Sequence, residues 1–271
     1  MPLLMQFSSC HKDSATPSYV YVNPFILKID SVAQGTSNNK IEDVWLYVNE
    51  QSLGAYQLPA KIPVIANGST QLLLSPGVLK NGITTMHFQY PFYTAYFDTV
   101  VLTKSQTTVI TPIVKYIDSA KFHLNETFEN GNTFSKLIGD TTIYRDNQPS
   151  ERLWSQWYGK ITLTPTNDTV EVYTPYFTLP YNSIVFIEMN YKCDIPITIG
   201  LLVNNSSGGE KYWVETLNAH STWNKIYIDI SDAVTQLQGT SYGIILKAGN
   251  TIGDITSPQN IYLDNIKLIS K

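Results

Sequence analysis

The stretch IYLDNIKLIS, residues 261–270, is a short run of apolar and β-branched residues of the kind that forms a strand. It is the last of about eight such stretches from residue 158 onward, separated by Gly, Pro and Asn turn residues. This spacing predicts a β-sandwich or jelly roll. The earlier stretches are YGKITLTP (158–165), TVEVYTPYFTLP (169–180), SIVFIEMNYKC (183–193), IPITIGLLVNN (195–205), KYWVETLN (211–218), WNKIYIDIS (223–231) and SYGIILKAG (241–249).

The composition favours sheet over the whole chain. Its 271 residues include 18 Tyr, 10 Phe and 5 Trp, and Thr, Ser and Asn are abundant, which suits strands better than helices. The net charge of −4 is small and no block of Lys and Arg occurs, so we expect no nucleic-acid partner. No apolar stretch approaches the roughly 20 residues of a membrane helix. One helical turn is expected, over SDAVTQLQG (231–239) with Ser231 as N-cap.

We therefore predict an all-β fold with two β-sandwich domains in series, the second a jelly roll. Residues 1–18 are interpreted as a signal and tether, 19–117 as a small sandwich and 118–271 as the jelly roll. In the first domain, IEDVWLYVNE (41–50) alternates, which places Val44 and Leu46 on one face and Trp45 and Tyr47 on the other. The aromatic run YPFYTAYF (90–97) is expected either at the joint between the domains or under a long loop.

Two sets of motifs resemble known families. VWLYVNEQSLGAYQLPAKIPV (44–64) and NGSTQLLLSPG (67–77) resemble the small Ig-like PEGA and carboxypeptidase-regulatory-like sandwiches, which implies a surface or spacer module. TFENGNTF (127–134), WNKIYIDIS and the closing IYLDNIKLI resemble the galactose-binding-like jelly roll of carbohydrate-binding modules. The second resemblance implies non-catalytic binding of a glycan.

The same resemblance implies a structural Ca²⁺. The matching positions are Glu129 in the opening motif and Asp264 in the closing one, and Glu126, Asn130 and Asn132 are nearby oxygen donors. Ca²⁺ takes six to eight hard oxygen ligands, so a cation here would join the first strand of the domain to its last. The alternative is an acid that is hydrogen-bonded to a turn.

Aromatic side chains in LWSQWYG (153–159) are the candidate ligand platform. Sugar rings stack their C–H faces on flat aromatic rings, and Trp154, Trp157 and Tyr158 lie in a polar context that suits an exposed loop. The alternative is that these rings pack in the core or at an interface. Trp223, in the later family motif, is assigned to packing.

No pattern supports catalysis. The four His residues lack metal-ligand spacing, and no nucleophile elbow, P-loop or dinucleotide fingerprint occurs. A glycosidase needs two carboxylates across a cleft, and the spacing of the Glu residues singles out no pair. We expect no enzyme activity and no catalytic residue.

Two further features point to export. PLLMQFSSC (2–10) resembles the lipobox of Bacteroidota lipoproteins and implies lipidation at Cys10, although the usual charged start and most of the apolar region are missing. Six of the 13 Asp residues open an Asp-Ser/Thr triplet that resembles the O-glycosylation motif of Bacteroidota, with ordinary turn chemistry as the alternative. The implied acceptors are Ser14, Ser31, Thr99, Ser119, Thr141 and Thr169.

The combined prediction is a non-catalytic lipoprotein, anchored by lipid alone at the outer membrane of the cell envelope. Its jelly roll is expected to bind a glycan or an envelope component. The alternative is a structural accessory lipoprotein that binds a protein partner and has no affinity for sugar.

Overall fold

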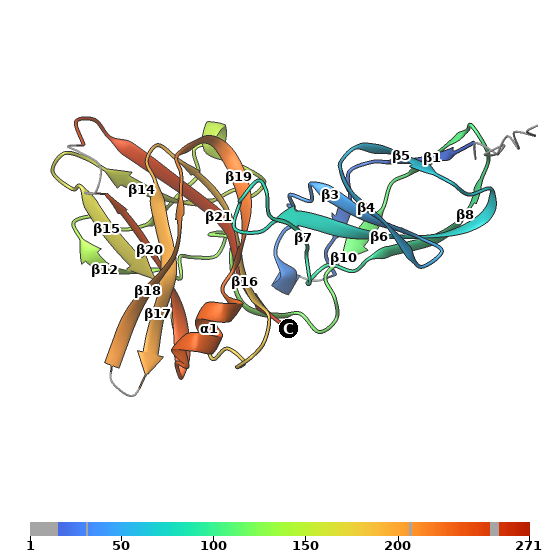
Figure 1. Ribbon diagram of the computed structural model, residues 1–271. Coiled ribbons are helices and arrows are strands. Elements are labelled where there is room, and N and C mark those ends of the chain that lie inside the picture. Colours follow the sequence, from blue (N-terminus) through green and yellow to red (C-terminus); the bar gives the residue numbers. More distant parts are fainter. Residues whose placement is uncertain (1–15, 31, 206–207, 250–254) are drawn as a thin grey trace, which may run out of the picture.

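The computed structural model describes residues 16–30, 32–205, 208–249 and 255–271 (Figure 1). The fold is all-β, as predicted, and the described residues contain one α-helix, α1 (Ser231–Leu237), and two short 3₁₀ helices, η1 (Val32–Gln34) and η2 (Pro149–Glu151). Cys10, Ser14 and Ser31 lie outside the described residues, so their predicted modifications stay predictions. In the described part of the chain no helix is long and apolar enough to cross a membrane.

The N-terminal strands form a first sandwich. One layer contains the sheets β5-β1-β9 and β10-β2, and the other contains β4-β3-β6-β7 with β8 also paired to β6. Strand β3 buries Val44 and Leu46 between the layers and turns Trp45 and Tyr47 outward, as the alternation predicts. The strands are β1 (Ser18–Val22), β2 (Ile26–Lys28), β3 (Asp43–Val48), β4 (Gln51–Gln57), β5 (Ala60–Val64), β6 (Gly68–Leu79), β7 (His87–Gln89), β8 (Tyr96–Leu102), β9 (Thr107–Ile110) and β10 (Ile113–Lys115).

The remaining strands form a second sandwich of two antiparallel sheets. We call β13-β14-β21-β16-β19, with β11 beside β21, the inner sheet, and β12-β15-β20-β17-β18 the outer sheet. In Figure 1 the inner sheet faces the first sandwich and the outer sheet faces away from it. The strands are β11 (Lys121–Glu126), β12 (Ser135–Gly139), β13 (Tyr144–Asp146), β14 (Tyr158–Leu163), β15 (Thr169–Tyr173), β16 (Val185–Cys193), β17 (Ile197–Asn205), β18 (Gly208–Leu217), β19 (His220–Asp229), β20 (Ser241–Gly249) and β21 (Gln259–Ser270).

The core of the second sandwich lies between its sheets. Residues at alternate positions, such as Ile199 and Leu201 of β17 and Ile244 and Leu246 of β20, are buried there. Helix α1 closes one end of this core through Ala233 and Val234. The predicted helix is confirmed, but its predicted cap is wrong, because Ile230 is the N-cap residue and Ser231 already lies in the helix.

The first sandwich packs directly on the outward face of the inner sheet. The rings of Tyr90 and Phe92 contact Phe186, with centroids 5.4 and 6.0 Å apart, and Tyr90 also lies 4.7 Å from Tyr227. The predicted role of the aromatic run as the joint between the two units is confirmed. The β6–β7 turn adds backbone contacts to β19, since Asn81 N donates to Tyr227 O at 2.9 Å.

A buried polar network crosses the same joint. The Glu188 carboxylate, fully buried, accepts hydrogen bonds from Tyr90 at 2.8 Å and Tyr116 at 3.0 Å, and it pairs with Lys225 at 2.7 Å. Lys267 Nζ donates to Tyr116 at 2.9 Å. Because Tyr90 and Tyr116 belong to the first sandwich and the charges to the second, the network holds the two units together.

The charged groups of this network change one another's pKa values. Burial alone raises the pKa of Glu188, but the ammonium groups of Lys225 and Lys267 outweigh it, so the pKa lies below its ordinary value. Burial lowers the pKa of Lys267 to about 7, against the opposing effect of Glu188. Burial also raises the pKa of Tyr90 and Tyr116, which therefore keep their protons and donate to Glu188.

We keep the division of the chain at residues 117 and 118 as a proposal. In the part of the chain that the structure describes, no sheet contains strands from both sides of this point. The two cores nevertheless meet, because Phe186, Tyr227 and Ile269 of the inner sheet belong to the apolar cluster of the first sandwich.

Candidate functional site

The residues of the predicted calcium site lie near the middle of β21, where the strand paired with β21 changes from β14 to β11. Asp264 is fully buried, and its carboxylate accepts hydrogen bonds from the Ser155 hydroxyl and, at 2.7 Å, from Asn265 N. Glu129 Oε1 accepts from the backbone N of Gln156 at 2.6 Å and Trp157 at 2.9 Å. The loop before β14 therefore supplies hydrogen-bond donors to both predicted ligands.

The arrangement does not fit a ready-made calcium site. Both oxygens of the buried Glu126 carboxylate are also occupied, by Phe128 N at 2.6 Å and by Thr133 N at 2.7 Å. Burial, with Glu129 and Glu126 adding to it, raises the pKa of Asp264 to about 7. Asn265 has a buried amide with no partner, but one amide oxygen falls far short of six to eight ligands. Among the described residues, no group of three or more His, Cys, Asp or Glu is placed to hold a metal. The predicted calcium stays untested, and because these oxygens already accept hydrogen bonds we expect the fold not to depend on it.

The three predicted aromatic residues take different positions. Trp154 is 71% exposed on its loop, as expected. Trp157 instead packs against the core, with the Arg145 guanidinium 4.3 Å from its ring centroid. Tyr158 is buried, with its ring 5.7 Å from that of Tyr262. These placements correct the expectation for Trp157 and Tyr158, because β14 begins at Tyr158 and both rings are covered.

Trp223 fulfils its predicted packing role. Its ring lies 6.4 Å from those of Tyr158 and Tyr262, and its indole N–H donates to Glu151 O at 2.8 Å. The predicted acceptor residues Thr99 and Ser119 are exposed, and Thr141 and Thr169 are half-buried. Their glycosylation stays a prediction.

The outward face of the outer sheet presents a second aromatic surface that the sequence did not single out. Alternation along β17 buries Ile199 and Leu201 and turns Gly200 outward. Gly200 lets the neighbouring strand approach closely at a register shift: a Cβ there would lie 2.3 Å from the backbone O of Tyr212 and 3.0 Å from Trp213 Cα and its ring atom Cε3. The Trp213 ring borders the glycine and remains 36% exposed.

Polar and charged groups surround this ring in cross-strand rows. Lys247 Nζ lies 5.8 Å from the centroid of the Trp213 ring. Lys211 of the edge strand pairs with Glu171 of β15, so this ion pair reaches across β17 and β20. We call these outward residues the Trp213 face. One row contains Tyr173, Ile245, Gly200 and Trp213, and the adjacent row contains Glu171, Lys247, Thr198 and Thr216, with Lys211 beyond them.

The chemistry of the Trp213 face suits a polyhydroxylated ring. An indole that lies on a flat sheet offers its face to C–H groups, while the hydroxyls of Thr198 and Thr216, the carboxylate of Glu171 and the ammonium of Lys247 lie in the same or the adjacent row. The Thr198 and Thr216 hydroxyls lie 3.1 Å apart, so they already form one polar pair.

Sequence reasoning missed Trp213 because its role depends on register. KYWVETLN predicts a strand, but Gly200 lies on another strand, and only the pairing of β17 with β18 brings it beside Trp213. The sole available signal was the isolated Gly in the apolar stretch IPITIGLLVNN, a pattern that suggests a close approach.

Comparison with known proteins places this chain in no established family. No family model matches the sequence, and no curated protein matches it. Several solved structures resemble it in outline. A structure from a study of promiscuous specificity among β-sandwich carbohydrate-binding modules has 14% identity and a TM-score of 0.40, and the alignment covers 83% of this chain and 85% of that one.

Two others resemble mainly one part of the chain. The family 11 carbohydrate-binding module of the Clostridium thermocellum cellulase Lic26A-Cel5E has 15% identity and a TM-score of 0.39, with 56% of this chain and 95% of that one covered. The enzymatically active domain of tailspike protein 4 from bacteriophage CBA120 has 10% identity and a TM-score of 0.41, with 60% and 25% covered. At these scores the likenesses carry no argument about this chain, and the functional case rests on the geometry.

Proposed function

We propose that this protein binds a glycan through the Trp213 face and does not catalyse a reaction on it. The observation that supports this proposal is the indole of Trp213. It lies beside Gly200, is 36% exposed and is bordered by hydroxyl and charged groups. A side chain at position 200 would clash first with the backbone O of Tyr212, so the close approach of β18, and with it the position of the ring, depends on this glycine. Trp154, 71% exposed on a separate loop, is a further stacking surface.

The binding experiment uses the full chain. Affinity gels first identify a soluble polysaccharide that retards the protein. Calorimetry with that polysaccharide then compares the affinity of the parent with that of Trp213→Ala. We expect the variant to lose about tenfold in affinity, because one stacked aromatic ring contributes about 1.4 kcal/mol. Tyr181→Ala, which removes a ring that is 60% exposed beside α1, is the matched control for removal of an exposed aromatic side chain elsewhere. Equal binding by the parent and Trp213→Ala would contradict the proposal.

A second candidate function is docking of a protein partner by the first sandwich. Strand β8 exposes Phe97 (61%) and Val101 (72%) on the same side as Thr99. Apolar side chains gathered on a surface often mark an interaction site. In the Cys10→Ser background, which removes the proposed lipid anchor, this function predicts that Phe97→Ser, and not Trp213→Ala, releases the protein from isolated cell envelopes.

We also propose lipid anchoring at Cys10 in the cell envelope, which rests on the lipobox-like sequence. Incorporation of a clickable fatty acid into the parent, and none into Cys10→Ser, is the expected result in a Bacteroidota host. Labelling of both proteins, or of neither, would contradict it.

A further inference from the structure

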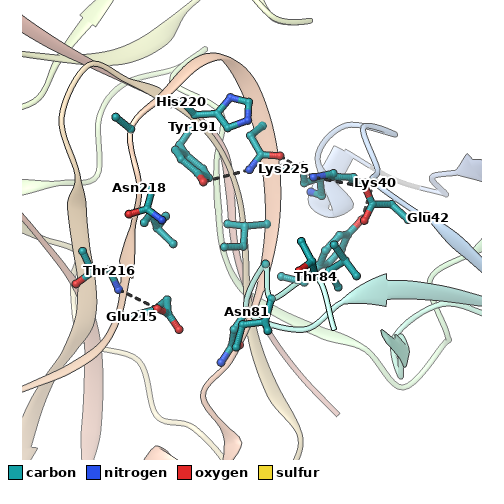
Figure 2. A pocket seen from close by; sticks show the side chains of 18 residues that line it. Lys40, Glu42, Asn81, Thr84, Tyr191, Glu215, Thr216, Asn218, His220 and Lys225 are labelled. Atoms are coloured by element: carbon teal, nitrogen blue, oxygen red, sulfur yellow. Dashed lines mark hydrogen bonds and ion pairs between the residues drawn. The ribbon is translucent and has the colours of Figure 1, made fainter. Parts of the chain in front are cut away.

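A cavity of about 470 Å³ lies at the joint between the two sandwiches (Figure 2). This is within the size range of small-molecule sites, about 300–1,000 Å³, and domain joints are preferred places for them. One wall comes from the segment before β3 and the β6–β7 turn, and the other from β16, β19 and the β18–β19 turn. Thr84, Asn218 and His220 are exposed, so the cavity opens to solvent.

A relay of hydrogen bonds forms one side of the cavity. Lys40 Nζ donates to Asn224 Oδ1 at 2.9 Å, and Asn224 Nδ2 donates to the Tyr191 hydroxyl at 3.1 Å (Figure 2). Lys40 also pairs with Glu42 at 3.6 Å. The Tyr191 hydroxyl, which accepts from Asn224, keeps its own proton to donate, and Asn224 keeps its second amide hydrogen. This relay therefore offers spare donors.

The opposite side offers acceptors. Figure 2 shows Glu215, Thr216 and Asn218 across the cavity from Lys40 and Glu42. One oxygen of Glu215 accepts from Thr216 N at 3.1 Å, which leaves further lone pairs on the carboxylate. A ligand that fits must accept hydrogen bonds from the relay and donate hydrogen bonds to the opposite side.

The charges of the lining favour a neutral ligand. Lys40 is already bonded to Glu42 and Asn224, and Lys225 is buried against Glu188, so an anion finds no free cation. Lys40 is balanced by Glu42 and Lys225 by Glu188, and Glu215 offers its carboxylate as a hydrogen-bond acceptor. Hydroxyl groups both donate and accept, and the apolar side chains of Leu79, Ile83 and Ile226 border the same space and suit C–H surface.

We propose that this cavity is a binding site for a neutral mono- or disaccharide, separate from the Trp213 face. Its walls are preformed, because the Glu188 network and the β6–β7 turn fix the two sandwiches to each other. A preformed site loses little free energy in ordering its side chains when the ligand binds. Binding here bridges both sandwiches and so stabilises their joint.

The test is an NMR titration of the full chain with maltose, cellobiose and lactose as separate probes. Glucosamine and galacturonate serve as cationic and anionic controls. We expect at least one neutral probe to shift the backbone amides of Thr84, Asn218 and His220, and the charged probes to bind at least about tenfold more weakly. The proposal is overturned if no neutral probe shifts these amides, or if either charged probe binds as well.

Two variants separate a ligand contact from a structural effect. Asn218→Ala and Tyr191→Phe each remove polar groups and are expected to weaken binding about three- to tenfold. Trp213→Ala is the control: it is expected to leave the shifts unchanged, so failure of the Trp213 face and failure of this site are distinguishable. Unchanged affinity in both cavity variants, with their spectra otherwise native, would overturn the proposal.

Discussion

The second sandwich carries charged side chains on the outward faces of both its sheets, and the two faces differ completely in what covers them. On the inner sheet, Glu188, Lys225 and Lys267 are at most 5% exposed, because the first sandwich packs on them. On the outer sheet, the side chain of Lys211 retains 33% exposure and that of its partner Glu171 retains 11%, and within the described chain no second domain covers them. The same strand alternation therefore produces a joint on one side and an uncovered face on the other.

The comparison shows that the contribution of a charged side chain to stability depends more on its partner than on its position along a strand. A buried charge must be paired and hydrogen-bonded, because the loss of one partner leaves the other unsatisfied in a medium of low dielectric constant. An exposed pair is solvated by water and contributes little. The predictions below test this difference.

The largest effect is expected at the centre of the joint. Glu188→Gln removes the charge that neutralises Lys225 and Lys267, and we expect the free energy of unfolding to fall by about 3–5 kcal/mol. Urea denaturation followed by tryptophan fluorescence measures it. A loss below about 1 kcal/mol would show that water enters the joint and that the two faces are alike.

The joint is also expected to respond to pH. Because the pKa of Lys267 falls from 10.5 to about 7 on folding, the unfolded chain binds more protons between these values. Stability should therefore rise with pH above about 7, by up to about 1.4 kcal/mol per unit from this group. The buried tyrosines oppose this rise only near pH 10 and above, where the unfolded chain loses their protons.

The control for this pH dependence is Lys267→Met, which retains the aliphatic stem. Urea denaturation at several pH values between about 7 and 9 should show a flatter dependence in the variant than in the parent. An identical slope in both proteins would assign the dependence to other groups.

On the open face the expected effect is small. Glu171→Gln removes the ion pair with Lys211, and we expect a loss of at most about 1 kcal/mol, since Lys211 then turns to water. It is the matched counterpart of Glu188→Gln, with the same chemical change on the other sheet. A loss comparable to that of Glu188→Gln would remove the distinction between the faces.

The smallest effect is expected from calcium removal. The carboxylates of Glu126, Glu129 and Asp264 are held by backbone N–H and hydroxyl donors, so EDTA should leave the Tm unchanged relative to excess Ca²⁺. A Tm that falls in EDTA and recovers with Ca²⁺ would show that these oxygens exchange their donors for the cation.

Sequence reasoning worked where a property is local. Alternation places Val44 and Leu46 inside, and the aromatic run 90–97, expected either at the joint or under a long loop, lies at the joint. It did not work where two distant strands must meet. The position of Trp213 beside Gly200 depends on register, and Glu188 and Lys267 sit at outward positions whose cover comes from another part of the chain.

The loop residues show the same limit. Trp154 and Trp157 are three residues apart in one polar segment, yet one is 71% exposed and the other packs on the core. Trp157 directly precedes β14 and its ring lies against the Arg145 guanidinium, whereas Trp154 lies three residues further from the strand. Composition around a loop cannot show which of its rings will meet such a partner.

The rigid joint also fixes a distance within the molecule. Strand β1 and the outer sheet lie at opposite ends of the structure (Figure 1), and the joint between them is filled with packed rings and paired charges instead of a linker. The distance and the orientation of the Trp213 face relative to Ser18 are therefore constant, and the first sandwich is a rigid spacer between them.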